Sequence, residues 1–477
     1  MTAKTPICSA LLDYDREKCL RLHMPGHAGG LGFDFPGFKE IGRFDVTEVF
    51  PFDNLQMPSG IIEESRHLLA QAFGAYESFF LVNGATSGIH TLFLSMINPG
   101  EKVLVPRNAH KSFFGGMVIS GCEPVYIPCQ VSEDFGLALS VSADDVALLL
   151  RENPNIKAIF LTSPTYYGTV LDIKAVAAET RMLNVPLIVD EAHGGHFSFH
   201  EEYPASALSC GADAAVNGLH KTLPVFNQGA CLHIGEALKD KSRIFSSYTL
   251  LTTTSPSYPI LASIEWARAF MEERGHGLME QALVLSHEYK FKINQIKGLK
   301  CGNKFLRAKG VAGYDPLKVV VFCDGLNIDG YELAQILRNE FQIQVEMSEP
   351  GLILAMMSLF HTRDDWEYFY QSLVCIAQKY YGEKKQSEPL VFMPFPEVIL
   401  TPREAFFAKK KRIRLEESRG LISAEMIAAY PPGIPCLLPG ELISDEVYDY
   451  MCYLKMTGAK IIGPEDGNLD FIYVIEQ

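Results

Sequence analysis

Short apolar runs alternate with helical patterns between residues 78 and 189, and this alternation constrains the fold more than any other feature. We predict strands at 79–82, 102–105, 124–127, 156–161 and 186–189, and helices at 87–97, 110–119, 143–151 and 173–183. Unbroken apolar strands separated by helices are typical of a mostly parallel sheet covered on both faces. Because ligands bind beyond the carboxyl ends of such strands, polar residues that follow them are the first candidates for a site.

The rest of the chain follows a different pattern. Two long helices are predicted at 262–276 and 281–296, followed by strands at 319–322 and 353–357 with helices at 330–341 and 364–381. Residues 384–388 resemble a linker, and residues 430–441 are rich in turn-forming proline and glycine. We therefore expect an N-terminal arm (1–35), a large α/β domain (36–297), a small α+β domain (298–388) and a C-terminal domain (389–477).

Composition excludes several classes of protein. A net charge of −15 argues against binding to nucleic acid, and no apolar run approaches the length of a membrane span. Asp13 and Asp15 interrupt any signal-peptide pattern, and the eleven cysteines follow no disulfide framework, which suggests reduced thiols in a cytoplasmic protein. The basic run at 409–414 is predicted to be a solvated helix face or loop.

Two strand ends carry the residues that predict the chemistry. Asp190 ends an apolar run, and about thirty residues later Lys221 closes what we interpret as a second strand. Lys221 can form a Schiff base with an aldehyde cofactor, and Asp190 can keep the pyridine nitrogen of that cofactor protonated. A surface lysine and a structural carboxylate are the alternatives. The pair predicts a pyridoxal 5′-phosphate (PLP) enzyme that cleaves a bond at the α-carbon of an amino acid.

A strand-to-helix junction at 83–88 suits the phosphate of such a cofactor. Its glycines let the backbone approach an anion, and free N–H groups at Ala85, Thr86 and Ser87 together with two hydroxyls could bind it. Hydroxyl residues are also common helix caps, so the junction alone is weak evidence. Beside Lys221 it predicts a phosphate cradle.

Several histidines allow both a catalytic and an ordinary role. His110 begins a helix and could stack on the pyridine ring or cap the helix. His193 and His220 could contact the cofactor or the carboxylate of the substrate. Glu191, His193 and His196 could instead hold zinc in a metal-dependent hydrolase, but no further cluster supports this, so we expect no metal.

Nine blocks of the sequence, spread over nearly the whole chain, resemble the bacterial ornithine/lysine/arginine decarboxylase family. They are HMPGHAGG (23–30), DVTEVFPFDNL (45–55), VNGATSGI (82–89), RNAHKS (107–112), VDEAHGGH (189–196), HKTLP (220–224), TTTSPSY (252–258), TPREAF (401–406) and YPPGIPCLLPGE (430–441). One such block would be weak evidence, whereas nine in order are specific.

The resemblance implies a fold type I PLP-dependent large domain, similar to aspartate aminotransferase, with a mostly parallel sheet and a smaller α+β C-terminal region. It implies that Lys221 carries the cofactor, Asp190 binds the pyridine nitrogen and His110 stacks on the ring. It also implies phosphate binding by Thr86 and Ser87 with His220 nearby, and a place for His193 beside the cofactor and substrate. The family forms homodimers or dimer-based oligomers, so residues 252–258, including Ser255, are expected to reach the site of the partner subunit.

The resemblance implies decarboxylation of a basic amino acid. The chain looks like the short, biosynthetic form, which favours L-arginine, converted to agmatine and CO₂ for polyamine biosynthesis. Lysine or ornithine decarboxylation, and another fold type I activity such as an aminotransferase or lyase, are the alternatives. Acidic residues that could bind the distal cation of the substrate or lie near the partner subunit are Asp45, Glu48, Asp53 and Glu441.

Two positions depart from the family pattern. Gly218 stands where many members have a serine, so Asn217 or Thr222 is expected to supply the missing phosphate contact. Asp53-Asn54-Leu55-Gln56 stands where the more usual pattern ends in histidine, which bears on the choice of substrate.

Overall fold

The computed structural model describes residues 3–132, 135, 137–302, 305–382, 394–429, 434–457 and 459–476. The chain divides into two compact units, one formed by Met1–Met96 and Pro186–Glu280 and the other by Ile97–Val185 and Gln281–Gln477. The predicted linker at 384–388 and part of the turn-rich segment at 430–441 lie outside the described residues. The four domain boundaries expected from the sequence stay a prediction.

In the first unit, four strands lie side by side in the order β1 (Glu77–Leu81), β10 (Ala230–Ile234), β9 (Ala214–Asn217) and β8 (Leu187–Asp190). The β1–β10 and β10–β9 pairs are antiparallel, whereas β9 and β8 are parallel. Every residue of β8, β9 and β10 is buried, which explains their continuous apolar sequences.

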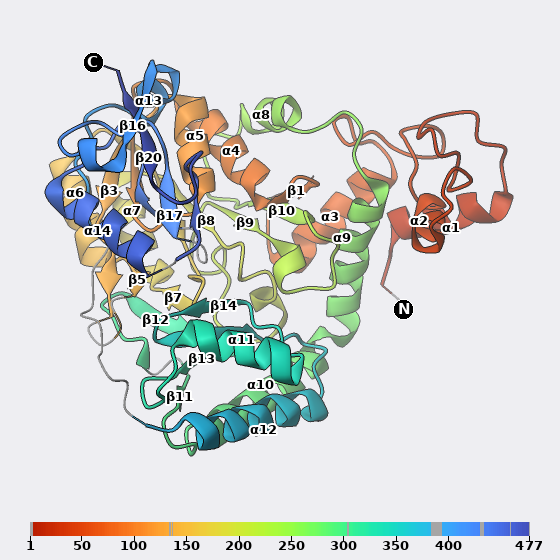
Figure 1. The fold of residues 1–477 in the computed structure, drawn as a ribbon. Helices are drawn as coiled ribbons and strands as arrows, with labels where there is room; N and C mark the ends of the chain where they lie inside the picture. The colour runs from red at the N-terminus through yellow and green to blue at the C-terminus, as the bar shows by residue number, and fades with distance from the viewer. Residues whose placement is uncertain are drawn as a thin grey trace. The chain divides into compact units, whose positions relative to one another are not determined.

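The same unit also contains helices (Figure 1). They are α1 (Pro6–Glu17), α2 (Pro36–Gly42), α3 (Ile61–Phe73), α4 (Gly84–Met96), α8 (Ile244–Leu251) and α9 (Tyr258–Phe270), with a short 3-10 turn at Phe197–Phe199. Helix α4 packs on β1, β9 and β10, and α1 packs on α3 and α9. A π-helical segment, Met271–Gly275, joins α9 to α10 (His276–Ile293), so the two helices predicted here form one nearly continuous helical run.

The second unit contains three parallel strands in the order β6 (Ile156–Thr162), β2 (Lys102–Pro106) and β3 (Glu123–Ile127). Helices α5 (Lys111–Ser120), α6 (Ala143–Glu152) and α7 (Ile173–Leu183) follow the predicted ranges closely. Two small ribbons complete this region, β4 (Gln130–Val131) with β5 (Ala138–Ser140) and β7 (Thr169–Leu171) with β12 (Val311–Tyr314).

A separate antiparallel sheet in the same unit has the order β11 (Lys300–Cys301), β13 (Lys318–Phe322), β15 (Leu352–Met356) and β14 (Met347–Glu349). Val319 and Val321 pack with residues of α11 (Gly330–Phe341) and α12 (Arg363–Tyr380). Figure 1 shows both helices beside this sheet. Val320 and Phe322 join a different core cluster that includes Tyr167. Alternate residues of a strand point to opposite faces, so this sheet is buried on both sides.

The C-terminal region has its own apolar core. Its elements are α13 (Pro402–Phe407), β16 (Lys410–Arg414), a 3-10 turn (Leu415–Glu417), β17 (Ile427–Ala429), β18 (Pro435–Leu437), α14 (Asp445–Met456), β19 (Ile461–Ile462) and β20 (Phe471–Ile475). The prediction of a helix face or loop for the basic run at 409–414 is wrong, because Lys410–Arg414 form β16, which pairs with β20. Ile413 is the one buried residue of this strand, so its sequence does not alternate between apolar and polar residues and does not reveal a strand. Among the described helices, none is long and apolar enough to cross a membrane.

Candidate active site

Lys221 lies in a 3-10 turn after strand β9, and not at the end of a strand as the sequence suggested. Strand β9 ends at Asn217, and Leu219–Lys221 form the turn. The chain leaves the sheet there because the Lys221 N–H donates to the Gly218 carbonyl at 2.9 Å. The Lys221 Nζ lies 3.1 Å from the His193 Nε2, so the structure brings these two predicted residues together.

Asp190 is the last residue of β8, and its carboxylate is buried. The Ala192 N–H donates to Oδ1 at 3.1 Å. Burial raises the pKa of this carboxyl above its ordinary value, while the charge of Lys221 and the Ala192 N–H oppose the rise. A desolvated carboxylate is stabilised by a cationic hydrogen-bond donor, and a protonated pyridine nitrogen is such a donor. Asp190 therefore fits the predicted cofactor.

The N-terminus of α4 has the geometry of an anion cradle. Gly84 has a φ of 72°, which favours glycine, and its N–H donates to the Gln228 carbonyl at 2.8 Å. The N–H groups of Ala85, Thr86 and Ser87 follow in the first turn, where a helix provides no carbonyl partners. The Ser87 hydroxyl donates to the Gly84 carbonyl at 2.8 Å. The backbone, more than the Ser87 hydroxyl, therefore makes the site fit a phosphate.

His220 and Thr222 flank Lys221 and differ in what they offer an anion. The His220 Nδ1 lies 3.0 Å from the Gly229 carbonyl, so Nδ1 carries the hydrogen and Nε2 of the neutral ring is an acceptor. Burial lowers the pKa of His220, which favours this neutral form. The Thr222 Oγ1 is buried and has no hydrogen-bond partner among the described residues. Thr222 is the better donor for a phosphate oxygen.

Glu191 and Asn217 form a buried pair that the sequence analysis did not find. The Asn217 Nδ2 donates to the Glu191 backbone carbonyl at 3.0 Å and to its Oε2 at 3.1 Å. The Ala207 N–H donates to the Glu191 Oε1 at 2.7 Å. Burial raises the pKa of Glu191 to about 8. Both residues are polar and sit at the ends of apolar strands, the same signal that singled out Asp190.

The residues proposed for a zinc site do not gather their ligand atoms in the described part of the chain. In that described part, the side chains close enough to hold a metal ion are instead those of His200, Glu201 and His276, whose ligand atoms lie within 4.8 Å of one another. Glu191, His193 and His196 do not form such a group. The geometry therefore gives no support to the metal-dependent hydrolase considered above.

The group around His200 is itself held by hydrogen bonds. The His200 Nδ1 accepts a hydrogen bond from the Glu202 N–H at 3.1 Å, so the hydrogen of the neutral ring is on Nε2. That Nε2 lies 3.1 Å from a carboxylate oxygen of Glu280. A metal ion at Nε2 would displace the Glu280 contact and would place the ring hydrogen on Nδ1, which could then no longer accept from the Glu202 N–H.

In the second unit, Arg107 and Glu441 form a buried ion pair. The Arg107 Nη2 lies 2.8 Å from the Glu441 Oε2, and the two side chains are 1% and 2% exposed. Arg107 also donates to the carbonyls of Pro435 at 2.7 Å and Cys436 at 3.3 Å. Burial raises the pKa of Glu441, and Arg107 opposes the rise. Glu441 is thus engaged within the chain, and its predicted role toward a substrate stays a prediction.

His110 and Thr162 are two further polar residues of this unit, one at a helix start and one at a strand end. His110 caps α5, since its Nδ1 accepts from the Ser112 N–H at 3.2 Å, which matches the ordinary role considered from the sequence. The cap uses a ring nitrogen and not the ring face, and stacking on a cofactor stays a prediction. Thr162 ends β6 and has a buried hydroxyl without a partner among the described residues, and the sequence analysis did not select it.

Asp45 and Glu48, predicted to bind a substrate or lie near a partner subunit, take part in local hydrogen bonds. The Asp45 Oδ2 lies 3.1 Å from the Nε2 of His27. Glu48 accepts from the Asn54 Nδ2 at 2.8 Å and from the Leu55 N–H at 3.1 Å. These contacts fix the N-terminal segment of the unit.

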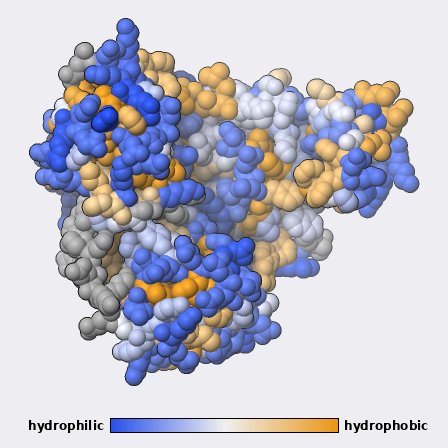
Figure 2. Space-filling view, viewed as in Figure 1, coloured by the Kyte–Doolittle hydropathy of each residue, from blue (hydrophilic) through white to orange (hydrophobic). Residues whose placement is uncertain are grey.

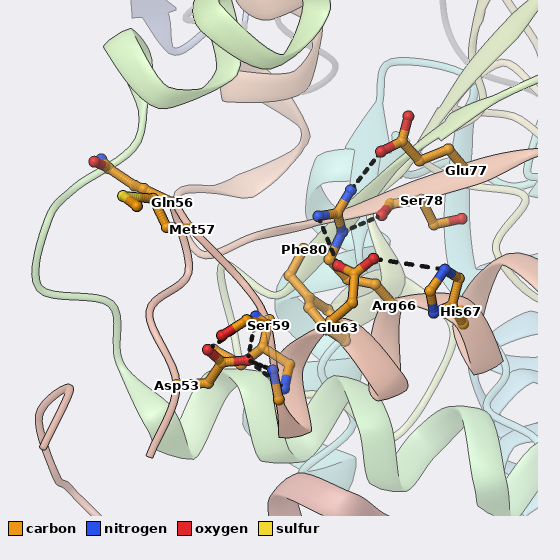
Figure 3. A network of polar contacts seen from close by, with 12 residues as sticks. Asp53, Gln56, Met57, Ser59, Glu63, Arg66, His67, Glu77, Ser78 and Phe80 are labelled. Carbon is orange, nitrogen blue, oxygen red and sulfur yellow. Dashed lines mark hydrogen bonds and ion pairs between the residues drawn. The ribbon is translucent and has the colours of Figure 1, made fainter. Parts of the chain in front are cut away.

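Asp53 anchors the start of helix α3, and Figure 3 shows its carboxylate beside Ser59. Its Oδ2 accepts from the N–H groups of Ser59 at 3.1 Å, Gly60 at 2.7 Å and Ile62 at 3.2 Å. A carboxylate at a helix N-terminus is stabilised by these free N–H groups. The contacts give Asp53 a structural role, and contact with a substrate stays a prediction.

Gln56 holds the segment that contains Ser255. Its Nε2 donates to the backbone carbonyls of Thr249 at 3.2 Å and Thr252 at 2.9 Å, at the end of α8 (Figure 3 shows the Gln56 side chain). The Ser255 N–H donates to the Thr253 hydroxyl at 3.1 Å. A neutral histidine at position 56 has a single N–H and could make only one of the two carbonyl contacts. The expected reach of Ser255 into a partner subunit stays a prediction.

The fold resembles those of solved lysine decarboxylases. The lysine decarboxylase LdcF of Francisella novicida superposes with a TM-score of 0.85 at 23% identity, covering 99% of this chain and 81% of that one. The ureidoglycine-glyoxylate aminotransferase of Bacillus subtilis gives a TM-score of 0.55 at 15% identity, covering 72% of this chain and 90% of that one. These likenesses confirm the predicted fold class, an α/β fold of the type I PLP enzymes with a further C-terminal region.

Sequence comparison identifies the family. Residues 5–309 match the model of the Orn/Lys/Arg decarboxylase major domain, and residues 385–463 match the C-terminal domain of the same family. The arginine decarboxylase of Bacillus subtilis (strain 168) is 35% identical over 99% of this chain and 98% of its own length. That of Halalkalibacterium halodurans is also 35% identical, whereas the lysine decarboxylase LdcA of Pseudomonas aeruginosa is 22% identical over 94% of this chain. The chain therefore belongs to the Orn/Lys/Arg decarboxylase family.

Proposed function

We propose that this protein is a PLP-dependent decarboxylase that converts L-arginine to agmatine and CO₂. Two observations together support the proposal. The chain is similar over nearly its full length to proteins named arginine decarboxylase, and the structure brings His193 next to Lys221, with Asp190 at the end of the neighbouring strand. The lysine decarboxylases among the relatives are more distant, at 22–23% identity, which favours arginine over lysine. Formation of agmatine would place the protein in polyamine biosynthesis.

Three groups of this chain are suited to hold the cofactor. Lys221 supplies an amine that can bind its aldehyde covalently and be exchanged for the amine of the substrate. Asp190 supplies a buried carboxylate for the ring nitrogen, and a charge-assisted hydrogen bond of this kind contributes about 1.5–3 kcal/mol. The first turn of α4 supplies N–H donors for the phosphate, and the hydroxyls of Thr86 and Thr222 are the proposed side-chain donors. When bound, PLP supplies an electron sink for the electrons released as CO₂ leaves.

His193 and Lys221 are the groups placed to move a proton. Their nitrogens are 3.1 Å apart, so a proton can pass between Nε2 and Nζ without movement of the backbone. Both side chains are at least partly buried, which limits competition from water. Either group could hold the proton that would return to the α-carbon after CO₂ has left.

The protein is proposed to act in the cytoplasm as a homodimer with shared active sites. Large apolar side chains are exposed on the N-terminal segment of the first unit, including Leu22 at 86% and Phe50 at 95%. Figure 2 shows apolar surface on this segment, drawn in red in Figure 1. Exposed apolar surface of this kind commonly marks a protein interface. A second copy of the chain is the proposed partner.

Two measurements test the proposal. Borohydride reduction of the purified yellow protein, followed by peptide mapping, should place the cofactor on Lys221. Competition of arginine, lysine and ornithine at equal concentration should give the highest kcat/KM for arginine. A reduced adduct on another lysine would refute the site. A tenfold preference for lysine or ornithine, about 1.4 kcal/mol in transition-state binding, would refute the choice of substrate while leaving the decarboxylase intact.

A further inference from the structure

Glu191 lies between the candidate catalytic residues Asp190 and His193, and both its backbone and its carboxyl form hydrogen bonds. Its N–H donates to the Val216 carbonyl at 2.9 Å, and its carbonyl accepts from the Gly194 N–H at 2.9 Å and from the Asn217 Nδ2 at 3.0 Å. Its carboxyl accepts from Asn217 and from the Ala207 N–H. The residue is 3% exposed and Asn217 is 1% exposed, so these bonds are shielded from water.

These bonds cross between the two strand ends that carry the chemistry. Asp190 immediately precedes Glu191, and the turn closed by the Gly194 N–H carries His193. Asn217 ends the neighbouring strand, and the turn that follows it carries Lys221. Asn217 thus donates both of its side-chain hydrogens across the gap between β8 and β9, to one residue.

We propose that Glu191 and Asn217 act together as positioning residues, which fix Asp190 and His193 relative to Lys221. The inference rests on the proposed function, because the three residues that the pair positions are those assigned to cofactor binding and proton transfer. Neither Glu191 nor Asn217 needs to touch the cofactor. Their effect is to hold one carboxylate and one imidazole at fixed places against an amine, which is the condition for fast chemistry in a preorganised site.

The chemistry of the pair supports a positioning role over a direct one. Both side-chain hydrogens of Asn217 are used on Glu191, so the amide has none left for a phosphate. The Glu191 carboxyl receives two donors and no cation among its described contacts, and burial favours its neutral form near pH 7. A neutral Glu191 leaves Asp190 as the negative charge of this strand end, which is what a protonated ring nitrogen requires.

The test is a double-mutant cycle on the full-length enzyme, with Glu191→Ala, Asn217→Ala and the double variant. With PLP saturating, each single variant should lower kcat by about 10- to 100-fold, because small misplacements of catalytic groups have effects of this size, while KM stays within about threefold. The double variant should lose no more than the worse single variant, since residues that act as a unit are not additive. The absorbance spectrum of the lysine-bound cofactor should change in all three.

A second measurement does not depend on turnover. In the enzyme freed of PLP, amide exchange in residues 190–194 should be faster in each variant than in the wild type, because the turn has lost its anchors. If Glu191→Ala does not fold, Glu191→Gln keeps an acceptor for the Ala207 N–H while setting an amide against the Asn217 Nδ2, and it should show the same changes to a smaller degree.

Ser78→Ala is the matched control. The Ser78 hydroxyl forms a buried hydrogen bond of 2.7 Å with the Nδ1 of His233, between β1 and β10, and neither residue is assigned to the cofactor or the substrate. Its removal should lower stability with near-normal kcat and cofactor spectrum. Single variants of Glu191 and Asn217 that behave like Ser78→Ala, or losses that add in the double variant, would overturn the proposal. Failure of the proposed function would appear differently, as a wild-type enzyme that decarboxylates none of the three basic amino acids.

Discussion

Breaking the buried pair of Arg107 and Glu441 should open the C-terminal region locally. In Glu441→Leu, the Arg107 guanidinium keeps its contacts with the carbonyls of Pro435 and Cys436 but loses its only charged partner among the described residues. Removal of one member of a pair as buried as this one costs about 3–5 kcal/mol, because the other charge stays desolvated. The Leu438 N–H also loses its acceptor, at 2.7 Å in the wild type.

Hydrogen exchange followed by mass spectrometry measures this loss where it occurs. In peptides that cover 434–442 and 107–120, a loss of about 3 kcal/mol corresponds to exchange about 100-fold faster when opening limits exchange thermodynamically. Global unfolding is a poorer measure, because a chain of several domains need not unfold in one step. Peptides from α11 and α12 serve as an internal reference in the same sample.

The double variant Arg107→Met/Glu441→Leu separates a charge effect from a packing effect. Replacement of a whole buried pair by apolar side chains is often neutral, so most of the protection should return. The remaining deficit should be about 1–3 kcal/mol, since the Leu438 N–H still lacks an acceptor. Unchanged exchange in Glu441→Leu, or a double variant less protected than the single one, would refute the reasoning.

Three further variants test individual residues. Asp190→Asn should fold and retain PLP but lose at least about 100-fold in kcat, since an amide cannot hold the ring nitrogen protonated, and a near-normal rate would contradict this assignment. Thr222→Val, which is similar in shape, should weaken PLP binding to the apoenzyme by about tenfold in a spectroscopic titration, whereas unchanged affinity would remove Thr222 from the phosphate site. Burial raises the pKa of Glu349 from its ordinary 4.5 to about 7. The folded state therefore keeps a proton that the unfolded state releases, and the contribution of Glu349 to stability should fall between about pH 4.5 and 7 by up to about 1.4 kcal/mol per pH unit, then level off. Denaturation across this range should give a flatter profile for Glu349→Gln, and an unchanged slope would show that another group is responsible.

Much of the fold follows from local patterns in the sequence. Helices α7 and α11 occupy the predicted ranges because their apolar residues repeat at helical spacing between clear end signals. Helix α1 was not predicted, although Ile7, Leu11 and Tyr14 have the spacing of one helix face. Its apolar pattern is short, and it packs on α3 and α9, which are distant in sequence.

The candidate site was predictable in position but not in detail. Asp190 and Lys221 could be singled out because polar residues after buried strands are costly unless they have a function. The partners of Arg107 and Glu191, two other buried polar residues next to strand ends, could not be predicted, because they come from elsewhere in the chain: Glu441 meets Arg107 across 334 positions, and Ala207 meets Glu191 across 16. A hydrogen bond of this kind depends on the fold as a whole, so no local pattern in the sequence announces it.

Because Gly218 has no hydroxyl, the sequence leaves Asn217 and Thr222 as equal candidates for the missing phosphate contact, and the hydrogen bonds of the structure distinguish them. Asn217 can donate only through Nδ2, and both hydrogens of that atom go to Glu191. A side chain at 218 itself would meet the backbone, since a Cβ there would lie 2.9 Å from the Ala192 carbonyl oxygen, in the turn that Glu191 and Asn217 hold. The buried Thr222 Oγ1 remains as a hydroxyl without a partner among the described residues. The bonds that fix Asp190 thus leave little room for a serine before the 3-10 turn, and they favour Thr222, on the other side of Lys221, as the donor to the phosphate.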